Sequence, residues 1–296
     1  MLPIKIAVGI ATVGRRKLLA ETLRQLSNQT RLPDCVFVSP VSEADYDAAD
    51  IGNLPYPLQI IYGSRGLCSQ RNSILNNTRE FTVIVFFDDD FFPESSYLRE
   101  VELCFEAEPN VVVTHGHLIA DGVRGPGIDI STARNLLSSC QHDNVSRPLT
   151  DTFGAYGCNM AVRLSSVYEH DLHFDEEMPL YGWMEDLEFC RRISAHGRIV
   201  KNWRMIGVHL GTKVGRISGL RYGYSQVANP IYIWRKGRLP FFCALKYLMQ
   251  NALANVGKAL RPEPWIDRRG RALGNCRALS DWIRGRMHPM RILDLE

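Results

Sequence analysis

Thr82-Val-Ile-Val-Phe-Phe-Asp-Asp-Asp90 is the stretch that decides the fold. A strand buried on both faces reads as a continuous run of β-branched and aromatic residues, so Thr82 to Phe87 predicts an interior strand. The three carboxylates at its end repel one another unless a cation or hydrogen-bond donors offset their charge. Open α/β sheets bind ligands at the C-terminal ends of their strands, and Mg2+ and Mn2+ prefer carboxylate oxygens. The stretch therefore predicts a metal site, with an acidic turn in solvent as the alternative.

Strand and helix patterns alternate through the first half of the sequence. This alternation predicts right-handed βαβ crossovers and an α/β fold, with a mixed, mostly parallel sheet flanked by helices. The Rossmann fingerprint GxGxxG is absent, and a short loop, Thr12-Val-Gly-Arg15, follows the first strand. The expected strands are residues 4–10, 36–39, 58–62, 82–87 and 111–119, and the expected helices are residues 15–28, 66–76 and 94–108.

The second half begins with residues 121–151, whose Gly, Ser, Asn, Asp and Pro content predicts a long surface loop. Residues 156–162 then read as a strand and residues 181–197 as a helical segment. Glu185 and Asp186 fall in the first turn of that helix, where the helix dipole favours an ionised carboxylate. Ordinary acidity at a helix start is the alternative, but Tyr181 and Trp183 beside them favour a rim that faces a ligand.

Composition excludes several classes of protein. The 296 residues are 45% hydrophobic and 23% charged, which is ordinary for a globular protein with a substantial core. The net charge of +3 is too small to indicate nucleic acid as a partner. The eight cysteines form no CxxC pair, which argues against a zinc site or a disulfide framework. Without a signal-peptide pattern or an apolar stretch of ~20 residues, we expect a cytoplasmic protein.

The order of the motifs resembles a family 2-type glycosyltransferase of the GT-A fold over residues 3–235. The resemblance implies an inverting, metal-dependent transfer from a nucleoside-diphosphate sugar, with UDP as the nucleotide, as in polysaccharide biosynthesis. The acceptor would be a hydroxyl of a saccharide or a lipid-linked saccharide. The motifs are the Thr12-Val-Gly-Arg15 loop, Arg71-Asn72, the acidic triplet, Gly157-Cys-Asn-Met-Ala161, Gly182-Trp-Met-Glu-Asp186 and Gly207-Val-His-Leu-Gly211.

The same resemblance implies a nucleotide site and a metal site. Asp90 and His209 would bind Mg2+ or Mn2+, although a histidine in an apolar strand can also be a core residue. Arg71 would line the nucleotide side unless it is a surface charge on its helix. The other residues implied on the nucleotide side are Asp88, Asp89, Thr12 and Arg15.

The resemblance also implies a base and an acceptor side. Asp186, with Glu185 beside it, would take the proton of the acceptor hydroxyl. The family commonly places an acidic residue after the second strand to read the nucleotide base. This sequence has Val38-Ser-Pro-Val41 there, with Asp45 or Asp47 as substitutes further along. The residues implied in the donor and acceptor pocket are Tyr156, Gly157, Asn159, Tyr181 and Trp183, and residues 222–230 would lie near the acceptor entrance.

The C-terminal region from Trp234 onward combines apolar and basic residues. This pattern is typical of an interfacial helix on anionic lipid, and it predicts peripheral attachment to the cytoplasmic membrane. A helical subdomain with a solvated basic face is the alternative. The expected domains are a catalytic domain at 1–233, with halves at about 1–120 and 150–233, and a basic helical extension at 234–296. The basic residues are Lys258, Arg261, Arg268, Arg269, Arg271, Arg277, Arg284, Arg286 and Arg291.

Two other functions fit parts of the sequence. A Mg2+-dependent nucleotidyltransferase acting on sugar phosphates also combines an α/β sheet with aspartates, but it would carry an N-terminal glycine-rich loop with a lysine. A non-catalytic protein that binds a sugar nucleotide or a glycan would not need Asp88, Asp90, Asp186 and His209 together.

Overall fold

The acidic-ended strand β4 (Val83–Asp88) lies in the interior of a mixed sheet. In the computed structural model, which describes residues 3–140 and 149–295, it pairs in parallel with β1 (Ile6–Thr12) and antiparallel with β8 (Asn159–Arg163). Val83 to Phe87 are buried, as their continuous apolar pattern predicts. The strand ends at Asp88, so the acidic triplet begins at the C-terminal end of an interior strand.

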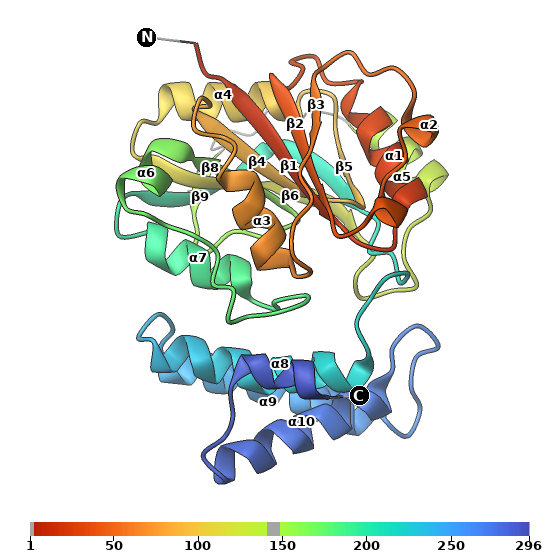
Figure 1. The fold of residues 1–296 in the computed structure, drawn as a ribbon, viewed down its shortest axis with the longest axis vertical. Helices are drawn as coiled ribbons and strands as arrows, with labels where there is room; N and C mark the ends of the chain where they lie inside the picture. Colours follow the sequence, from red (N-terminus) through yellow and green to blue (C-terminus); the bar gives the residue numbers. More distant parts are fainter. Residues whose placement is uncertain (1–2, 141–148, 296) are drawn as a thin grey trace. The chain divides into compact units, whose positions relative to one another are not determined.

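The sheet has the strand order β3-β2-β1-β4-β8-β6-β9-β5, with β7 paired to β9. Strands β3, β2, β1 and β4 are mutually parallel, as the alternation of strands and helices predicts. They lie side by side in Figure 1, in red to orange. The antiparallel β8 separates them from the parallel pair β6 and β9. The other strands are β2 (Cys35–Pro40), β3 (Leu58–Ile60), β5 (Phe91–Pro93), β6 (Val111–Asp121), β7 (Leu149–Asp151) and β9 (Arg198–His209).

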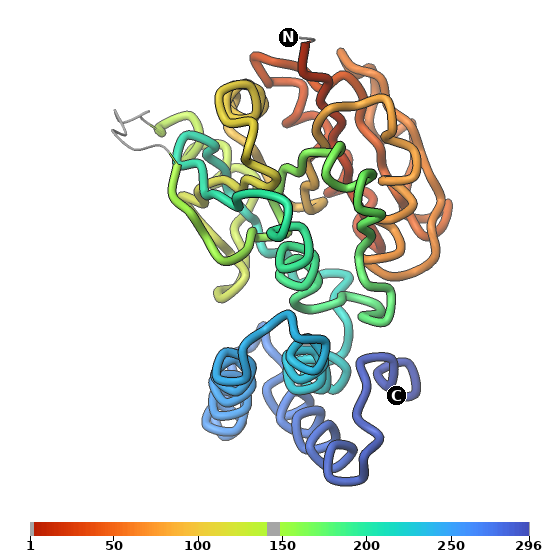
Figure 2. Tube along the Cα trace, turned by 90° about the vertical axis from the view of Figure 1, so that its left-hand side faces the viewer, coloured from red at the N-terminus to blue at the C-terminus, as the bar shows by residue number. Residues whose placement is uncertain are grey.

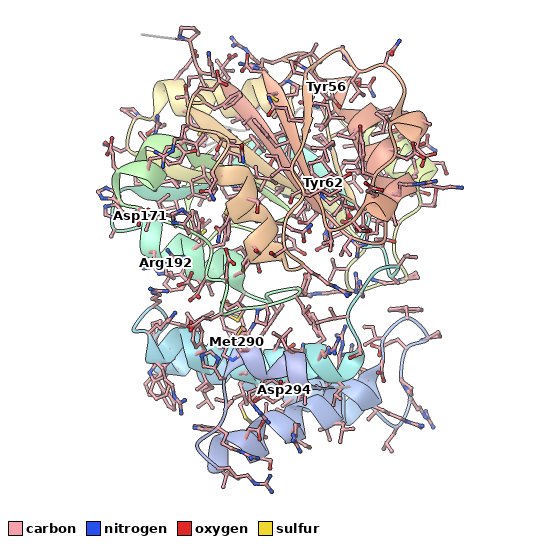
Figure 3. All side chains as sticks on the ribbon, viewed as in Figure 1. Tyr56, Tyr62, Asp171, Arg192, Met290 and Asp294 are labelled. Carbon is pink, nitrogen blue, oxygen red and sulfur yellow. The ribbon has the colours of Figure 1, made fainter. Side chains whose placement is uncertain are left out.

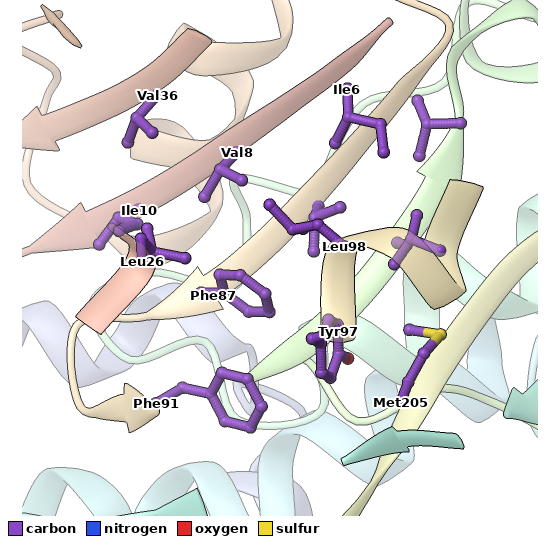
Figure 4. Packing of buried hydrophobic residues seen from close by; sticks show 14 of the residues in the cluster. Ile6, Val8, Ile10, Leu26, Val36, Phe87, Phe91, Tyr97, Leu98 and Met205 are labelled. Atoms are coloured by element: carbon purple, nitrogen blue, oxygen red, sulfur yellow. The ribbon is translucent and has the colours of Figure 1, made fainter. Parts of the chain in front are cut away.

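Helices α1 (Arg16–Leu26) and α4 (Tyr97–Ala107) cover one face of this sheet. Their apolar side chains join those of β1 and β4 in one buried cluster (Figure 4). Phe87 stacks on Phe91 at 4.9 Å between ring centroids, and the Tyr97 ring meets Phe87 edge-on at 5.2 Å. The short helices on this part of the chain are η1 (Glu43–Asp45), α2 (Ala48–Ile51), α3 (Leu67–Leu75), α5 (Ile130–Ser138) and α6 (Leu164–Glu169).

The chain divides into two compact units. Unit 1 comprises residues 1–64, 70–173 and 193–215 and contains the sheet, and unit 2 comprises residues 65–69, 174–192 and 216–296. Among the described helices, none is both long and apolar enough to cross a bilayer. The elements of unit 2 are α7 (Glu185–Ile193), α8 (Gly219–Arg235), α9 (Phe241–Lys258), α10 (Arg268–Ile283) and η2 (Pro289–Asp294).

Helices α8, α9 and α10 pack around a small apolar core in unit 2 (Figure 2). Its centre is formed by Tyr224, Ile231, Leu248 and Ala278. Two glycines let α8 and α10 approach closely. A Cβ on Gly223 would lie 2.1 Å from the carbonyl oxygen of Arg271, and a Cβ on Gly274 would lie 2.1 Å from that of Leu220.

The α/β fold class is confirmed, while one expectation about the chain requires correction. The long loop predicted over residues 121–151 is wrong in part, because α5 forms there with the Asp129 side chain capping its N-terminus, and residues 149–151 form β7. Residues 141–148 of that prediction lie outside the described part. The predicted boundary between residues 233 and 234 falls inside α8, and the division into functional domains stays a prediction.

Candidate active site

Asp88, Asp90 and His209 come together at the edge of the sheet in unit 1. One ligand atom from each lies within 4.8 Å of the others, and the three could hold a metal ion. Nε2 of His209 is 3.2 Å from Oδ1 of Asp90 and 3.9 Å from Oδ2 of Asp88. Oδ1 of Asp90 is buried without a regular hydrogen bond in the described part of the chain. A cation would satisfy this oxygen, so the donor set fits a divalent metal.

The turn after β4 brings the three side chains together. The chain reverses after Asp90, and β5 then pairs antiparallel with β9, which places Phe91 opposite His209. The backbone N–H of Leu210 donates to the carbonyl of Asp90 at 2.9 Å, and that of Thr212 donates to Oδ2 of Asp90 at 2.8 Å. Thr212 thus leaves Oδ1 as the oxygen that faces the histidine.

Asp121, at the end of β6, orients His209. Its Oδ1 lies 3.1 Å from Nδ1 of the imidazole, because Asp121 is opposite His209 in the parallel β6–β9 pair. Burial lowers the pKa of His209, but the hydrogen bond to Asp121 and the close, negatively charged Asp90 outweigh burial and raise the pKa to about 10. The sequence reasoning missed Asp121. Its signal was a carboxylate directly after an apolar strand, the same pattern that identifies Asp88.

Thr12, Arg15 and Asp89 contact one another. The Thr12 hydroxyl donates to Asp89 Oδ2 at 2.7 Å, and Nη1 of Arg15 donates to Asp89 Oδ1 at 2.8 Å. Asp89 is only 3% exposed, and burial raises its pKa to about 6 although the nearby Arg15 lowers it. Asp89 therefore ties the loop after β1 to the loop after β4. The predicted roles of these residues toward a nucleotide stay predictions.

Arg71 is buried, so the alternative of a surface charge is wrong. Its Nη2 donates to the carbonyl of Gly157 at 2.9 Å and lies 3.4 Å from Oδ1 of Asp88. The guanidinium carbon lies 5.4 Å from the centroid of the Phe86 ring. Arg71 therefore links the start of the acidic triplet to the segment before β8.

The other predicted pocket residues of unit 1 lie on or before β8. The Tyr156 ring meets the His209 ring edge-on at 5.8 Å between centroids, and its hydroxyl is 3.5 Å from Oδ2 of Asp121. Asn159 is fully buried, and neither polar atom of its side chain has a partner among the described residues. The structure thus brings Tyr156 to the metal cluster, whereas Asn159 faces the interior beside its strand partner Phe87.

Asp45 and Asp47, the two candidates for reading the nucleotide base, accept hydrogen bonds from nearby backbone groups. Oδ1 of Asp45 accepts from the backbone N–H of Gly14 at 2.6 Å, and Oδ2 accepts from the backbone and hydroxyl of Ser42. The Asp47 side chain caps α2 by accepting from Ala49 at 2.9 Å. Asp45 therefore lies beside the loop that follows β1, and Asp47 lies at the start of a helix.

In unit 2, Glu185 and Asp186 begin α7, as predicted. Glu185 is 6% exposed, whereas Asp186 is partly exposed and accepts from the backbone N–H of Leu187 at 2.7 Å. The loop before them is strained, because Leu180 and Met184 have φ values of 58° and 73°. Such strain is typical of segments that present side chains to a ligand.

An aromatic cluster, Tyr181, Trp183 and Tyr222, lies beside this loop. The ring centroids of Tyr181 and Tyr222 are 5.6 Å apart, and those of Trp183 and Tyr222 are 6.4 Å apart. The guanidinium of Arg271 lies 4.2 Å from the Tyr222 ring centroid. Burial raises the pKa of Tyr222, Arg271 and Arg216 lower it, and Glu185 and Asp186 raise it further. These charges all act within unit 2.

Solved structures of similar fold include a mannosyltransferase. No protein-family profile matches the sequence, and no curated protein matches it significantly. Residues 1–349 of TarS from S. aureus align with 95% of this chain and 92% of theirs, at 13% identity and a TM-score of 0.56. The chain spans 53% of the longer TarS structure. The mannosyltransferase PcManGT from Pyrobaculum calidifontis aligns with 99% of this chain and 86% of its own, at 14% identity and a TM-score of 0.55.

A third neighbour, GalNAc-T7, aligns with 95% of this chain and 57% of its own, at 11% identity and a TM-score of 0.53. TarS has been solved with UDP and with UDP-GlcNAc, PcManGT with GDP-Man and Mn2+, and GalNAc-T7 with UDP, GalNAc and Mn2+. The chain therefore has the GT-A fold, and the resemblance read from its motifs is confirmed at the level of the fold.

Proposed function

We propose that this protein transfers a sugar from a nucleoside-diphosphate sugar, with UDP as the nucleotide, to a hydroxyl of a saccharide or a lipid-linked saccharide. The observation that carries the proposal is the Asp88, Asp90 and His209 cluster at the strand ends of a GT-A fold. Ligands bind at this edge of an α/β sheet. Three neighbours of the same fold have been solved with nucleotides or nucleotide sugars, which supports this class of donor.

The cluster would hold Mg2+ or Mn2+. When bound, the cation would neutralise the negative charge that builds on the diphosphate as it leaves. Asp88 and Asp90 would supply the oxygen ligands and His209 the nitrogen ligand. Asp121 would keep Nε2 of His209 turned toward the carboxylates.

A carboxylate at the start of α7 would complete an inverting transfer. The acceptor oxygen would form a bond to the anomeric carbon from the side opposite the diphosphate, while the bond to the diphosphate oxygen breaks. Asp186, or Glu185 beside it, would take the proton from the acceptor hydroxyl. We favour Asp186 because its side chain is partly exposed, whereas Glu185 is buried.

Aromatic rings would bind the acceptor sugar. The Tyr181 side chain is 44% exposed and lies beside Trp183 and Tyr222. The face of an aromatic ring carries partial negative charge. It therefore attracts the weakly positive C–H groups of a sugar. Tyr156, Gly157 and Asn159 stay proposed residues of the donor and acceptor pocket.

A thermal-shift screen tests the proposal. Ligands that bind the native state raise its apparent stability, so UDP or a UDP-sugar should raise the melting temperature, and Mn2+ should increase the effect. A competent donor should also be hydrolysed slowly by water in place of an acceptor. Stabilisation by nucleoside triphosphates with release of pyrophosphate would identify a nucleotidyltransferase instead. Tight donor binding without hydrolysis or transfer would identify a non-catalytic binding protein.

Attachment of residues 234–296 to an anionic membrane stays a proposal. Some basic residues of this region are engaged within unit 2 and would not contact lipid. Arg268 forms an ion pair with Glu263 at 2.9 Å, and its side chain is only 11% exposed. Arg271 packs on the Tyr222 ring. These two arginines stabilise unit 2 internally, so any electrostatic attraction to lipid would come from other residues.

A further inference from the structure

Helix α9 exposes a continuous apolar stripe. One side of the helix buries Ala244, Leu248 and Asn255 within unit 2. The opposite side exposes apolar residues at intervals of three or four positions, which places them on one line along the helix. We call this line the α9 stripe; it consists of Phe242, Leu245, Met249, Leu253 and Val256, which are 81%, 36%, 43%, 64% and 59% exposed.

Both charged residues of this helix are basic. The 18 residues of α9 include Lys246 and Lys258 and no aspartate or glutamate. Lys246 is exposed next to Leu245, and Arg261 is exposed shortly after the helix ends. Lys258 pairs with Glu263 at 2.6 Å. Among the described residues, Lys246 and Arg261 form no ion pair with an acidic side chain.

We propose that α9 lies in the surface of an anionic membrane, with the α9 stripe among the lipid chains and Lys246 and Arg261 at the headgroups. A helix with an apolar face and basic flanks binds such a surface through buried apolar area and attraction to anionic lipid. This inference rests on α9 alone and holds whether or not the protein transfers sugars. It narrows the sequence-based prediction for the region from Trp234 onward to α9, because Arg268 and Arg271 are engaged within unit 2.

A second copy of the chain is a poorer match for the stripe. Two α9 helices packed stripe to stripe would bring both copies of Lys246, which flanks the stripe at 100° per residue, into one interface. Because α9 has no acidic residue, this interface would hold like charges with no compensation from the helix itself. Anionic lipid offers the opposite charge and an apolar layer at once.

Vesicle flotation of the full chain tests the proposal. The probes are phosphatidylcholine vesicles with and without phosphatidylglycerol, at low and high salt. We expect the wild type to float with the anionic vesicles, and less so at high salt, because screening weakens surface attraction. Phe242→Glu and Leu253→Glu should each lower the partition coefficient about tenfold or more, since each replaces an apolar group in the lipid by a charge.

Leu136→Glu is the matched control. It places the same charge on α5 of unit 1, where Leu136 is 38% exposed, and it should float like the wild type. Lys246→Glu should reduce binding to anionic vesicles and leave binding to neutral vesicles unchanged. All these positions are exposed, so we expect each variant to fold. Circular dichroism melting checks that it does.

Two results would overturn the proposal. The first is flotation of Phe242→Glu and Leu253→Glu equal to that of the wild type. The second is a wild type that does not float with vesicles and is a dimer by light scattering, while Leu253→Glu is a monomer. That result would assign the α9 stripe to contact with a second copy of the chain.

Discussion

Nδ1 of His209 lies 3.1 Å from Oδ1 of Asp121, a carboxylate on the neighbouring parallel strand. An ionised carboxylate can only accept, so Nδ1 carries the proton and donates it in this hydrogen bond. Nε2 then faces Asp88 and Asp90, which is the direction needed for a metal ligand. A carboxylate behind a ligating histidine fixes the tautomer and the orientation of its ring.

Asp121→Asn should weaken binding of Mn2+ by about 10-fold to 100-fold, as loss of such a partner commonly does. The amide can turn its NH2 group toward Nδ1, which would move the imidazole proton to Nε2 and block the ligand position. Isothermal titration with Mn2+ measures the change. Asp171→Asn is the control, because Asp171 is 94% exposed at the surface of unit 1 (Figure 3). Equal Mn2+ affinity in Asp121→Asn and the wild type would remove the orienting role.

Asp90→Ala should abolish the part of UDP binding that depends on a divalent metal, and turnover with it. Asp90 supplies a buried oxygen without a regular hydrogen bond to the cluster. UDP titrations with and without Mn2+ separate the metal-dependent part of the affinity from the remainder. Asp90→Asn is the companion variant, since its amide oxygen can still accept from Thr212. Full turnover in excess EDTA would contradict the metal requirement.

Asp186→Asn should lower kcat by roughly 100-fold or more, because the amide cannot take the acceptor proton. Affinity for UDP should change little, which nucleotide titration checks. Glu185→Gln is the control, since adjacent helical residues point about 100° apart and only one can face the acceptor. Loss of turnover in Glu185→Gln alone would transfer the role to Glu185. Full turnover in both variants would mean that these carboxylates only begin the helix.

Arg15→Ala should lower the free energy of unfolding by about 3 kcal/mol, because it leaves the buried Asp89 carboxylate without its cation. Urea unfolding measures the change. The double variant Arg15→Ala/Asp89→Asn should recover part of the loss, since it removes the unpaired charge, and a double-mutant cycle gives the coupling. Weaker UDP binding by Arg15→Ala at unchanged stability would indicate a role toward the nucleotide only.

His115 should make the protein acid-sensitive. Burial, with Lys201 nearby, lowers the pKa of His115 to about 4 from the ordinary 6.5. Between these pH values the unfolded chain binds a proton that the native protein does not. The stability that depends on neutral His115 is therefore complete above pH 6.5 and falls, by up to about 3 kcal/mol, as the pH drops toward 4.

Urea unfolding at a series of pH values measures this loss of stability. His115→Gln, which does not titrate, should show a shallower decrease over the same range. Parallel pH curves for the variant and the wild type would assign the acid sensitivity to other groups.

The sequence alone predicted the parallel strands, the acidic edge of the sheet and the start of α7. Each depends on a local pattern: a continuous apolar run, the residue that follows it, and helical spacing before a glycine. Asp121 escaped prediction because its contact with His209 depends on the register of two strands whose paired residues are 88 positions apart. Register between distant strands is fixed by tertiary packing, which no short window of sequence contains.

The contacts of Asp89 and Arg271 also escaped prediction, for a different reason. Both look like exposed charges in the sequence, one in an acidic triplet and one in a basic tail. The structure pairs Asp89 with Arg15 and packs Arg271 on Tyr222. A charged residue type does not reveal whether its partner is solvent, a ligand or another side chain, because that depends on three-dimensional neighbours.

The close contact between α8 and α10 has a consequence for altering the protein. Gly223 directly follows Tyr222, and the backbone beside it is that of Arg271. Main-chain contact therefore sets the separation of the two helices where Tyr222 and Arg271 meet. Substitutions at these two side chains would remove the contact between the guanidinium and the ring but keep the helix separation, so a library confined to them tests the proposed acceptor side without demanding a new fold.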